Sequence, residues 1–124
     1  MGYANPFQIG SGLHMRLYSR AFLIGTKTSS RPILFINIDA GMSSQLVKTQ
    51  VVNLLQQEYG ADVFDHSNVM ISATHTHSGP GGYFQYFLFD VTSLGFSNAT
   101  FEAMTSGILQ VNSPKGFVYL NDCF

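Results

Sequence analysis

Charged residues are scarce in this sequence of 124 residues. Asp, Glu, Lys and Arg make up 10% of the chain, whereas an ordinary soluble domain has about 25%. Lys and Arg form no cluster, which excludes the basic surface that nucleic-acid binding requires. Hydrophobic residues reach 45% and aromatic residues 14%, which excludes an intrinsically disordered chain. Because a complete small domain needs a charged surface to stay soluble, this composition is typical of a piece of a larger protein.

Cysteine and long apolar runs are equally rare. The single cysteine, Cys123, excludes a disulfide bond within the chain. No run of about 18 apolar residues occurs, which excludes a membrane-spanning helix. The first residues also lack the basic and apolar regions of a signal peptide. We therefore expect either a cytosolic protein or a targeting segment that lies outside this sequence, and the length suits one compact domain.

A strand–helix–strand unit is predicted in the first half of the chain. Residues 33–38 form a nearly continuous apolar run, which is typical of a strand covered on both faces. Ser43 or Ser44 can cap a helix whose apolar residues recur at helical spacing up to Tyr59, and Gly60 stands where a C-terminal cap belongs. Residues 68–73 are predicted as the next strand. This order predicts a βαβ unit with parallel strands and an α/β fold class.

The rest of the chain adds further elements around that unit. We predict an irregular loop over residues 1–15, a strand over 16–24, helices over 83–89 and 99–109, and a last strand over 117–120. Ser97 or Asn98 is suited to cap the second of these helices. The predicted architecture is therefore a fragment of a larger α/β catalytic domain, with additional helices around the βαβ unit.

A histidine-containing segment follows the strand predicted at 68–73. Residues 74–82 read Thr-His-Thr-His-Ser-Gly-Pro-Gly-Gly, and they lie at the carboxyl edge where α/β proteins build their sites. Residues two apart in extended backbone point the same way, so His75 and His77 are expected to face one cavity. Two imidazoles suit half of a zinc site, since a catalytic zinc ion needs three protein ligands. The glycines that follow let backbone approach a ligand closely.

The two-residue spacing of His75 and His77 also occurs by chance. Other residues near this segment have two interpretations each. Asp39 is either a carboxylate that orients an imidazole or a polar end of its strand, and the second is favoured. The aromatic side chains either line a substrate channel or belong to the core, and the core is favoured; they are Tyr83, Phe84, Tyr86, Phe87 and Phe89. Asn98 begins a glycosylation sequon that has meaning only in a secreted protein. His14 and His66 receive no role.

Several segments in the same order resemble the neutral (non-lysosomal) ceramidase family. They are residues 1–5 (MGYAN), 16–22 (RLYSRAF), 38–42 (IDAGM), 72–80 (SATHTHSGP), 82–86 (GYFQY) and 95–98 (GFSN). The resemblance is strongest over residues 1–110, and residues 111–124 form a poorly matched tail. We interpret residues 1–124 as the N-terminal part of the catalytic domain of such an enzyme.

The resemblance implies a zinc-dependent amidohydrolase that splits ceramide into sphingosine and a fatty acid. It implies that His75 ligates zinc and that His77 lies beside the head group of the substrate. It also implies that the backbone carbonyl of Leu13 contributes to a structural cation site, for calcium or magnesium. The implied partners are ceramide or another sphingolipid and the membrane surface, without nucleic acid, and the implied location is extracellular, at the cell surface or vesicular.

This sequence also departs from the family pattern. The remaining zinc ligands of the family, a second His, a Glu and a Tyr, come from further along its sequence, as does a Gly-Asp-x-Ser-Pro-Asn segment with the serine assigned to catalysis. None of them occurs here, so we expect a truncated chain that is inactive alone. Two alternatives stay open, namely a non-catalytic module that binds lipid or protein and an unrelated His-x-His metalloprotein.

Overall fold

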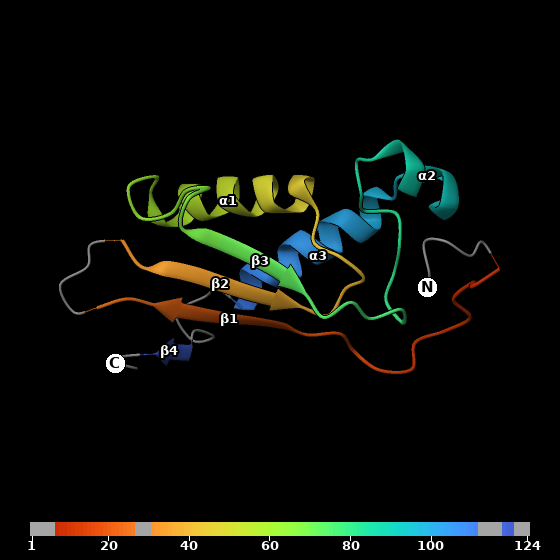
Figure 1. The fold of residues 1–124 in the computed structure, drawn as a ribbon, viewed down its shortest axis with the longest axis horizontal. Helices are drawn as coiled ribbons and strands as arrows, with labels where there is room; N and C mark the ends of the chain where they lie inside the picture. The colour runs from red at the N-terminus through yellow and green to blue at the C-terminus, as the bar shows by residue number, and fades with distance from the viewer. Residues whose placement is uncertain (1–6, 27–30, 112–117, 121–124) are drawn as a thin grey trace.

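The computed structural model describes residues 7–26, 31–111 and 118–120. Figure 1 shows the elements in chain order, which are β1 (Ser19–Ile24), β2 (Ile33–Ile38), α1 (Gln45–Tyr59), β3 (Val69–Ala73), α2 (Phe87–Ser93), α3 (Asn98–Val111) and β4 (Val118–Leu120). The MGYAN segment, Phe117 and Cys123 lie outside the described residues. None of the described helices is long and apolar enough to cross a membrane.

The strands form a mixed sheet in the order β3-β2-β1-β4. β2 and β3 are parallel, with Leu34 opposite Val69 and Ile38 opposite Ala73, and α1 connects them. The predicted βαβ unit and the α/β class are therefore confirmed. β1 runs antiparallel to β2 and parallel to β4. A connection as short as that between β1 and β2 cannot form the crossover that parallel neighbours require.

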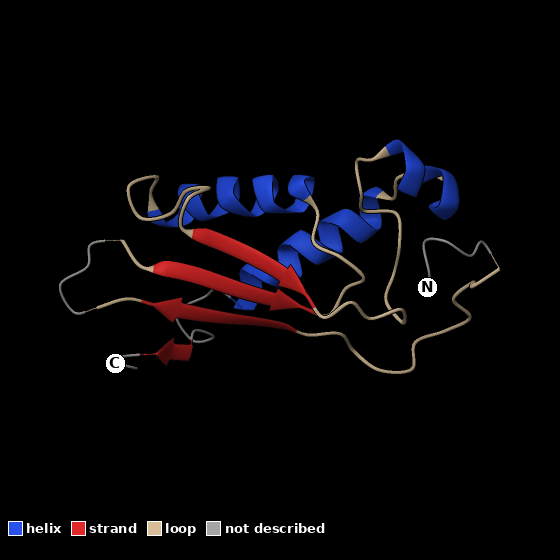
Figure 2. Cartoon of the chain, in the orientation of Figure 1, coloured by secondary structure: helices blue, strands red, loops and turns tan. Residues whose placement is uncertain are grey.

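The hydrophobic core lies between one face of the sheet and the helices, which gather on that side (Figure 2). α1 packs against β3 and α3, while α3 packs against β1. Leu34, Ile36 and Ile38 of β2 are buried, but Ile33 is 45% exposed. The expectation that this strand is covered on both faces is thus wrong within the described residues. The uncovered face is itself partly apolar, since the Phe22 and Phe35 rings stack there at 6.1 Å.

The predicted caps of two helices are confirmed. The Ser44 side chain accepts a hydrogen bond from the Val47 N–H at the start of α1, and Gly60 ends that helix with a φ of 96°. Ser97 Oγ accepts from the Thr100 N–H at 3.3 Å at the start of α3. Each cap satisfies a backbone group that a helix end leaves without an intrahelical partner, which explains why local sequence located these helices well.

Two predicted boundaries are wrong. β1 begins at Ser19 rather than at residue 16, because the Tyr18 N–H donates to the Asp39 carboxylate. The predicted helix at 83–89 is displaced, since α2 starts only at Phe87. Tyr83 and Phe84 are buried in the core, and the Gln85 side chain accepts from Ser44 Oγ at 2.9 Å. Tertiary contacts therefore hold this stretch in a non-helical conformation.

Candidate functional site

The histidine segment lies at the carboxyl end of the parallel pair, as predicted. Beyond the strand ends, the Thr74 N–H donates to the Ile38 carbonyl at 3.0 Å and the Thr76 N–H to the Ala40 carbonyl at 3.1 Å. These bonds extend the pairing of β2 and β3 into their loops. They fix the backbone on both sides of His75, so this side chain projects from an anchored part of the loop.

His75 is held by its backbone and by its ring. Its φ of 61° lies in the left-handed region, which is uncommon for residues other than glycine and concentrates at functional sites. Its Nδ1 lies 2.6 Å from the Gly41 carbonyl oxygen. A carbonyl oxygen only accepts hydrogen bonds, so this contact places the proton of the neutral ring on Nδ1. Nε2 is then unprotonated and has the lone pair that a metal ligand needs.

His77 brings a second imidazole nitrogen to the same point. The Nε2 atoms of His75 and His77 are 3.5 Å apart, and the rings meet nearly edge-on at a centroid distance of 5.1 Å. Both side chains are exposed. Two nitrogens at the zinc distance of about 2.0–2.1 Å in tetrahedral geometry would be about 3.3–3.4 Å apart. The pair therefore fits part of a zinc site, while the described residues contain no group of three His, Cys, Asp or Glu side chains that could hold a metal ion.

Asp39 does not orient either imidazole. Its carboxylate accepts from both terminal nitrogens of Arg20, at 3.0 and 3.3 Å, and from the Tyr18 N–H at 3.0 Å. The hydrogen bond with Arg20 is the main reason that the pKa of Asp39 is lowered. The interpretation of Asp39 as a polar strand end is thus correct. The group that orients His75 is the backbone carbonyl of Gly41, which sequence reasoning missed.

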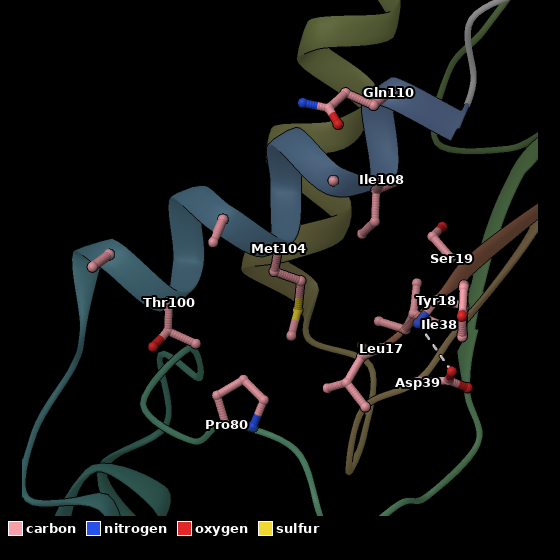
Figure 3. Close-up of a pocket in the computed structure, with 13 residues that line it drawn as sticks. Leu17, Tyr18, Ser19, Ile38, Asp39, Pro80, Thr100, Met104, Ile108 and Gln110 are labelled. Atoms are coloured by element: carbon pink, nitrogen blue, oxygen red, sulfur yellow. Dashed lines mark hydrogen bonds between the residues drawn. The ribbon is translucent and has the colours of Figure 1, made fainter. Parts of the chain in front are cut away.

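An apolar pocket of about 620 Å³ lies next to this loop. Figure 3 shows it between α3 and the chain entering β1, with Leu17, Asp39, Pro80, Met104 and Ile108 among its labelled walls. Neither histidine lines this pocket. None of the predicted aromatic residues lines it either, so the proposed aromatic channel wall is not found here.

The aromatic segment divides between the core and the surface. Tyr83 and Phe84 are 0% and 2% exposed, and their rings stack at 4.4 Å, which confirms the core interpretation for these two. Phe89 packs against the core. Tyr86 and Phe87 instead stay on the surface, with Phe87 83% exposed.

The glycines after the histidines serve packing within the chain. A Cβ on Gly79 would lie 3.4 Å from a Leu17 methyl group, in ordinary contact. A Cβ on Gly82 would lie 3.2 Å from the Ser97 Cβ, and Gly82 has a φ of 82°. The Gly82 carbonyl accepts from the Ser97 N–H at 2.6 Å. These two positions thus bring the loop close to the segment before β1 and to the start of α3.

The other candidate residues lie outside the imidazole pair. Leu13 is in the irregular segment before β1 and is 79% exposed; its assignment to a cation site stays a prediction. His14 and His66 are exposed. Asn98 is exposed at the start of α3, and its glycosylation also stays a prediction.

Residues 1–113 match the profile of a family described as neutral/alkaline non-lysosomal ceramidase, N-terminal. Neutral ceramidase 3 of Arabidopsis thaliana is 53% identical over 110 residues, covering 89% of this chain and 15% of the relative. The neutral ceramidase of Pseudomonas aeruginosa is 43% identical over 110 residues, covering 89% of this chain and 16% of the relative. The chain therefore spans about one sixth of the length of such relatives.

Solved structures agree with this similarity. The fold matches a neutral ceramidase from Pseudomonas aeruginosa with a TM-score of 0.81 at 41% identity, over 89% of this chain and 17% of the solved one. It also matches a structure described as a ceramidase complexed with C2, with a TM-score of 0.80 at 42% identity, over 88% of this chain and 17% of the other. The match covers the fold in which the imidazole pair sits.

Proposed function

Because the chain belongs to the neutral/alkaline non-lysosomal ceramidase family, we propose that it is part of a zinc-dependent amidohydrolase. The proposed reaction cleaves the amide bond of ceramide to sphingosine and a fatty acid. The observation that carries this proposal is the convergence of the His75 and His77 Nε2 atoms at 3.5 Å, at the carboxyl end of the parallel strands. When bound, zinc supplies a Lewis acid that polarises a carbonyl group and lowers the pKa of water towards about 7.

The residues of this chain have distinct roles in the proposal. His75 binds the metal through Nε2, while the Gly41 carbonyl holds its Nδ1–H at 2.6 Å. His77 presents its Nε2 beside that point and exchanges a hydrogen bond or a proton with the head group of the substrate. The left-handed backbone at His75 sets the direction of its ring. Further metal ligands then have to come from outside the described residues, since these contain no group of three His, Cys, Asp or Glu side chains that could hold a metal ion.

The apolar pocket supports a lipid substrate. Its walls are mainly aliphatic, and a volume of about 620 Å³ lies within the usual range of small-molecule sites, which runs from about 300 to 1,000 Å³. Asp39 and Pro80 of its lining flank the loops that carry Gly41 and the histidines. We assign this pocket to an aliphatic chain of the substrate. A lipid substrate also agrees with an enzyme that acts at the cell surface, in secretions or in vesicles.

The isolated chain is proposed to be inactive, because His75 alone supplies one of the three protein ligands that a catalytic zinc ion needs. We expect the purified 124-residue chain to hydrolyse no ceramide, with or without added zinc. Turnover above that of a His75→Ala variant would overturn this expectation.

Zinc binding tests the imidazole assignments separately from activity. Isothermal titration should show weak binding to the unmodified chain and a loss of about tenfold or more in His75→Ala, while His66→Ala serves as the control with an exposed imidazole far from the pair. His77→Ala is expected to keep more affinity than His75→Ala. Equal losses in both would make both residues ligands, and equal affinities in His75→Ala and His66→Ala would contradict the zinc assignment.

Membrane contact is a second proposed role, which helix α2 favours. Phe87 and Leu88 of α2 are 83% and 71% exposed, and Leu94, which follows this helix, is 95% exposed. Exposed apolar patches of this kind mark protein or membrane contacts. A non-catalytic lipid- or protein-binding role is thus retained beside the enzymatic one. The alternative of an unrelated metalloprotein is excluded by the family match.

A further inference from the structure

Tyr83 contacts the same peptide group that orients His75. Its ring is fully buried and stacks on Phe84 at 4.4 Å. Its hydroxyl donates to the Met42 carbonyl at 2.8 Å and accepts from the Met42 N–H at 3.3 Å. The Met42 N–H and the Gly41 C=O belong to one planar peptide unit. Tyr83 therefore holds one end of that unit while His75 holds the other, at 2.6 Å.

We propose that Tyr83 is a positioning residue for His75 and acts through the Gly41–Met42 peptide. In a trans peptide the N–H and C=O groups point in opposite directions, so the plane cannot turn without losing both contacts. A hydrogen bond at the N–H also polarises the carbonyl and makes it a better acceptor. The Tyr83 hydroxyl thus favours the ring orientation and the tautomer in which His75 presents an unprotonated Nε2. The link to metal binding rests on the proposed function.

The surrounding contacts explain why this role falls to Tyr83. Gly41 lies in the loop between β2 and α1, directly after Ala40, whose carbonyl accepts the last backbone hydrogen bond that extends the pairing of β2 with β3. Before this peptide in the chain, the Ala40 carbonyl accepts a hydrogen bond from the Thr76 N–H. After it, Ser44 Oγ donates to Gln85 Oε1. The Gly41–Met42 peptide lies between these two anchors. The Tyr83 side chain reaches this peptide from the core.

The test is the tautomer of His75 in the 124-residue chain, read by long-range ¹H–¹⁵N NMR without metal at a pH about two units above the ordinary histidine pKa of about 6.5. We expect the Nδ1–H form to dominate in the unmodified chain. Tyr83→Phe keeps the ring and should lower the ratio of this form to the other by about two- to tenfold, the range that one net hydrogen bond contributes to an equilibrium. Tyr83→4-aminophenylalanine keeps a donor for the Met42 carbonyl but is a poor acceptor for the Met42 N–H, so it should restore little of it.

A matched control separates positioning from stability. Thr105→Val also deletes a buried hydroxyl, one that donates to the Phe101 carbonyl at 2.9 Å within α3, and it should leave the tautomer ratio of His75 unchanged. An unchanged ratio in Tyr83→Phe, or equal changes in both variants, would overturn the proposal. If Tyr83→Phe does not fold, hydrogen exchange in the unmodified chain decides, since rapid exchange at the Met42 amide would refute the contact.

Zinc titration of the same samples distinguishes this proposal from the proposed function. A changed tautomer ratio in Tyr83→Phe, together with no zinc binding by the unmodified chain, would support positioning and contradict the zinc site. Zinc binding by the unmodified chain, together with an unchanged tautomer ratio in Tyr83→Phe, would support the zinc site and contradict the positioning role of Tyr83. If both proposals hold, Tyr83→Phe should also weaken zinc binding by about tenfold, the lower end for partners of metal ligands.

Discussion

Replacing three glycines on either side of α2 by alanine, one at a time, should give variants whose free energies of unfolding follow a fixed order. Gly79 has room for a Cβ at 3.4 Å or more from its neighbours and has no positive φ. Gly95 has a φ of 110° with nothing within 4 Å of a Cβ. Gly82 combines a φ of 82° with Cβ neighbours in residues 95–97 at 3.2 to 3.4 Å. The three positions thus separate no strain, backbone strain alone, and backbone strain with crowding.

The magnitudes follow from these geometries. Alanine at Gly79 loses nothing in the folded state and restricts the unfolded chain, so its effect on the free energy of unfolding should lie between zero and a gain of about 1 kcal/mol. Alanine at Gly95 should cost about 1–2 kcal/mol for its left-handed conformation. Alanine at Gly82 should cost about 2–3 kcal/mol, because the Ser97 Cβ and the Gly95 carbonyl must also move.

Urea unfolding followed by far-UV circular dichroism measures the series. The slopes with urea should agree among the variants, since a change of slope reports a change in compactness rather than in stability. Gly82→Ala should lie at least about 2 kcal/mol below Gly79→Ala at 25 °C, which is roughly a thirtyfold change in the unfolding equilibrium. Equal stabilities of these two variants would refute the inference that Gly82 is required by its conformation and its contact with Ser97.

Two further predictions concern charge and lipid contact. Hydrogen bonding to Arg20 lowers the pKa of Asp39, so the pair stabilises the fold above the unfolded Asp pKa of about 3.9, and this contribution is lost as the pH falls through the lower folded pKa. Arg20→Gln should therefore reduce the drop in urea midpoint between about pH 5 and pH 2, and an unchanged drop would contradict the role of the pair. On the second point, Phe87→Ser combined with Leu88→Ser should lower cosedimentation with phosphatidylcholine vesicles by about tenfold or more, since each buried side chain contributes about 1.5–3 kcal/mol. Met70→Ser, at a side chain 55% exposed on β3, is the control, and an equal loss there would argue against α2 as the contact.

Local sequence signals predicted the elements whose ends are closed by their own side chains. Ser44 and Gly60 close α1 at its two ends, and Ser97 caps α3, so both helices could be located from residue types alone. The continuous apolar run of β2 and the helix after it predicted that β2 pairs with β3 in parallel, which the structure shows. The run did not reveal that one face of β2 is uncovered, because apolar residues on an uncovered face look the same in sequence as buried ones.

Tertiary contacts decided the boundaries that were predicted wrongly. The aromatic run suggested a helix from Tyr83, yet Tyr83 bonds to Met42 and Gln85 to Ser44, and each partner lies about forty positions earlier in the chain. Helical propensity differs by less than about 1 kcal/mol among such residues. Burial of a single aromatic ring is worth more than that, so the core contacts override the local preference.

The chemistry of the candidate site divides in the same way. Side-chain type and strand position suffice to single out His75 and His77. The backbone at His75 is left-handed rather than extended as expected, so the alternation of an extended segment does not explain how the two imidazoles come together. The partner of His75 is a backbone carbonyl, which any residue at position 41 could supply, so no residue type announces it. Its direction depends on the Tyr83 hydroxyl and on the left-handed backbone of His75. The orientation of the imidazole is thus a property of the folded loops, and substitutions at Tyr83 should affect it while leaving the His-x-His motif intact.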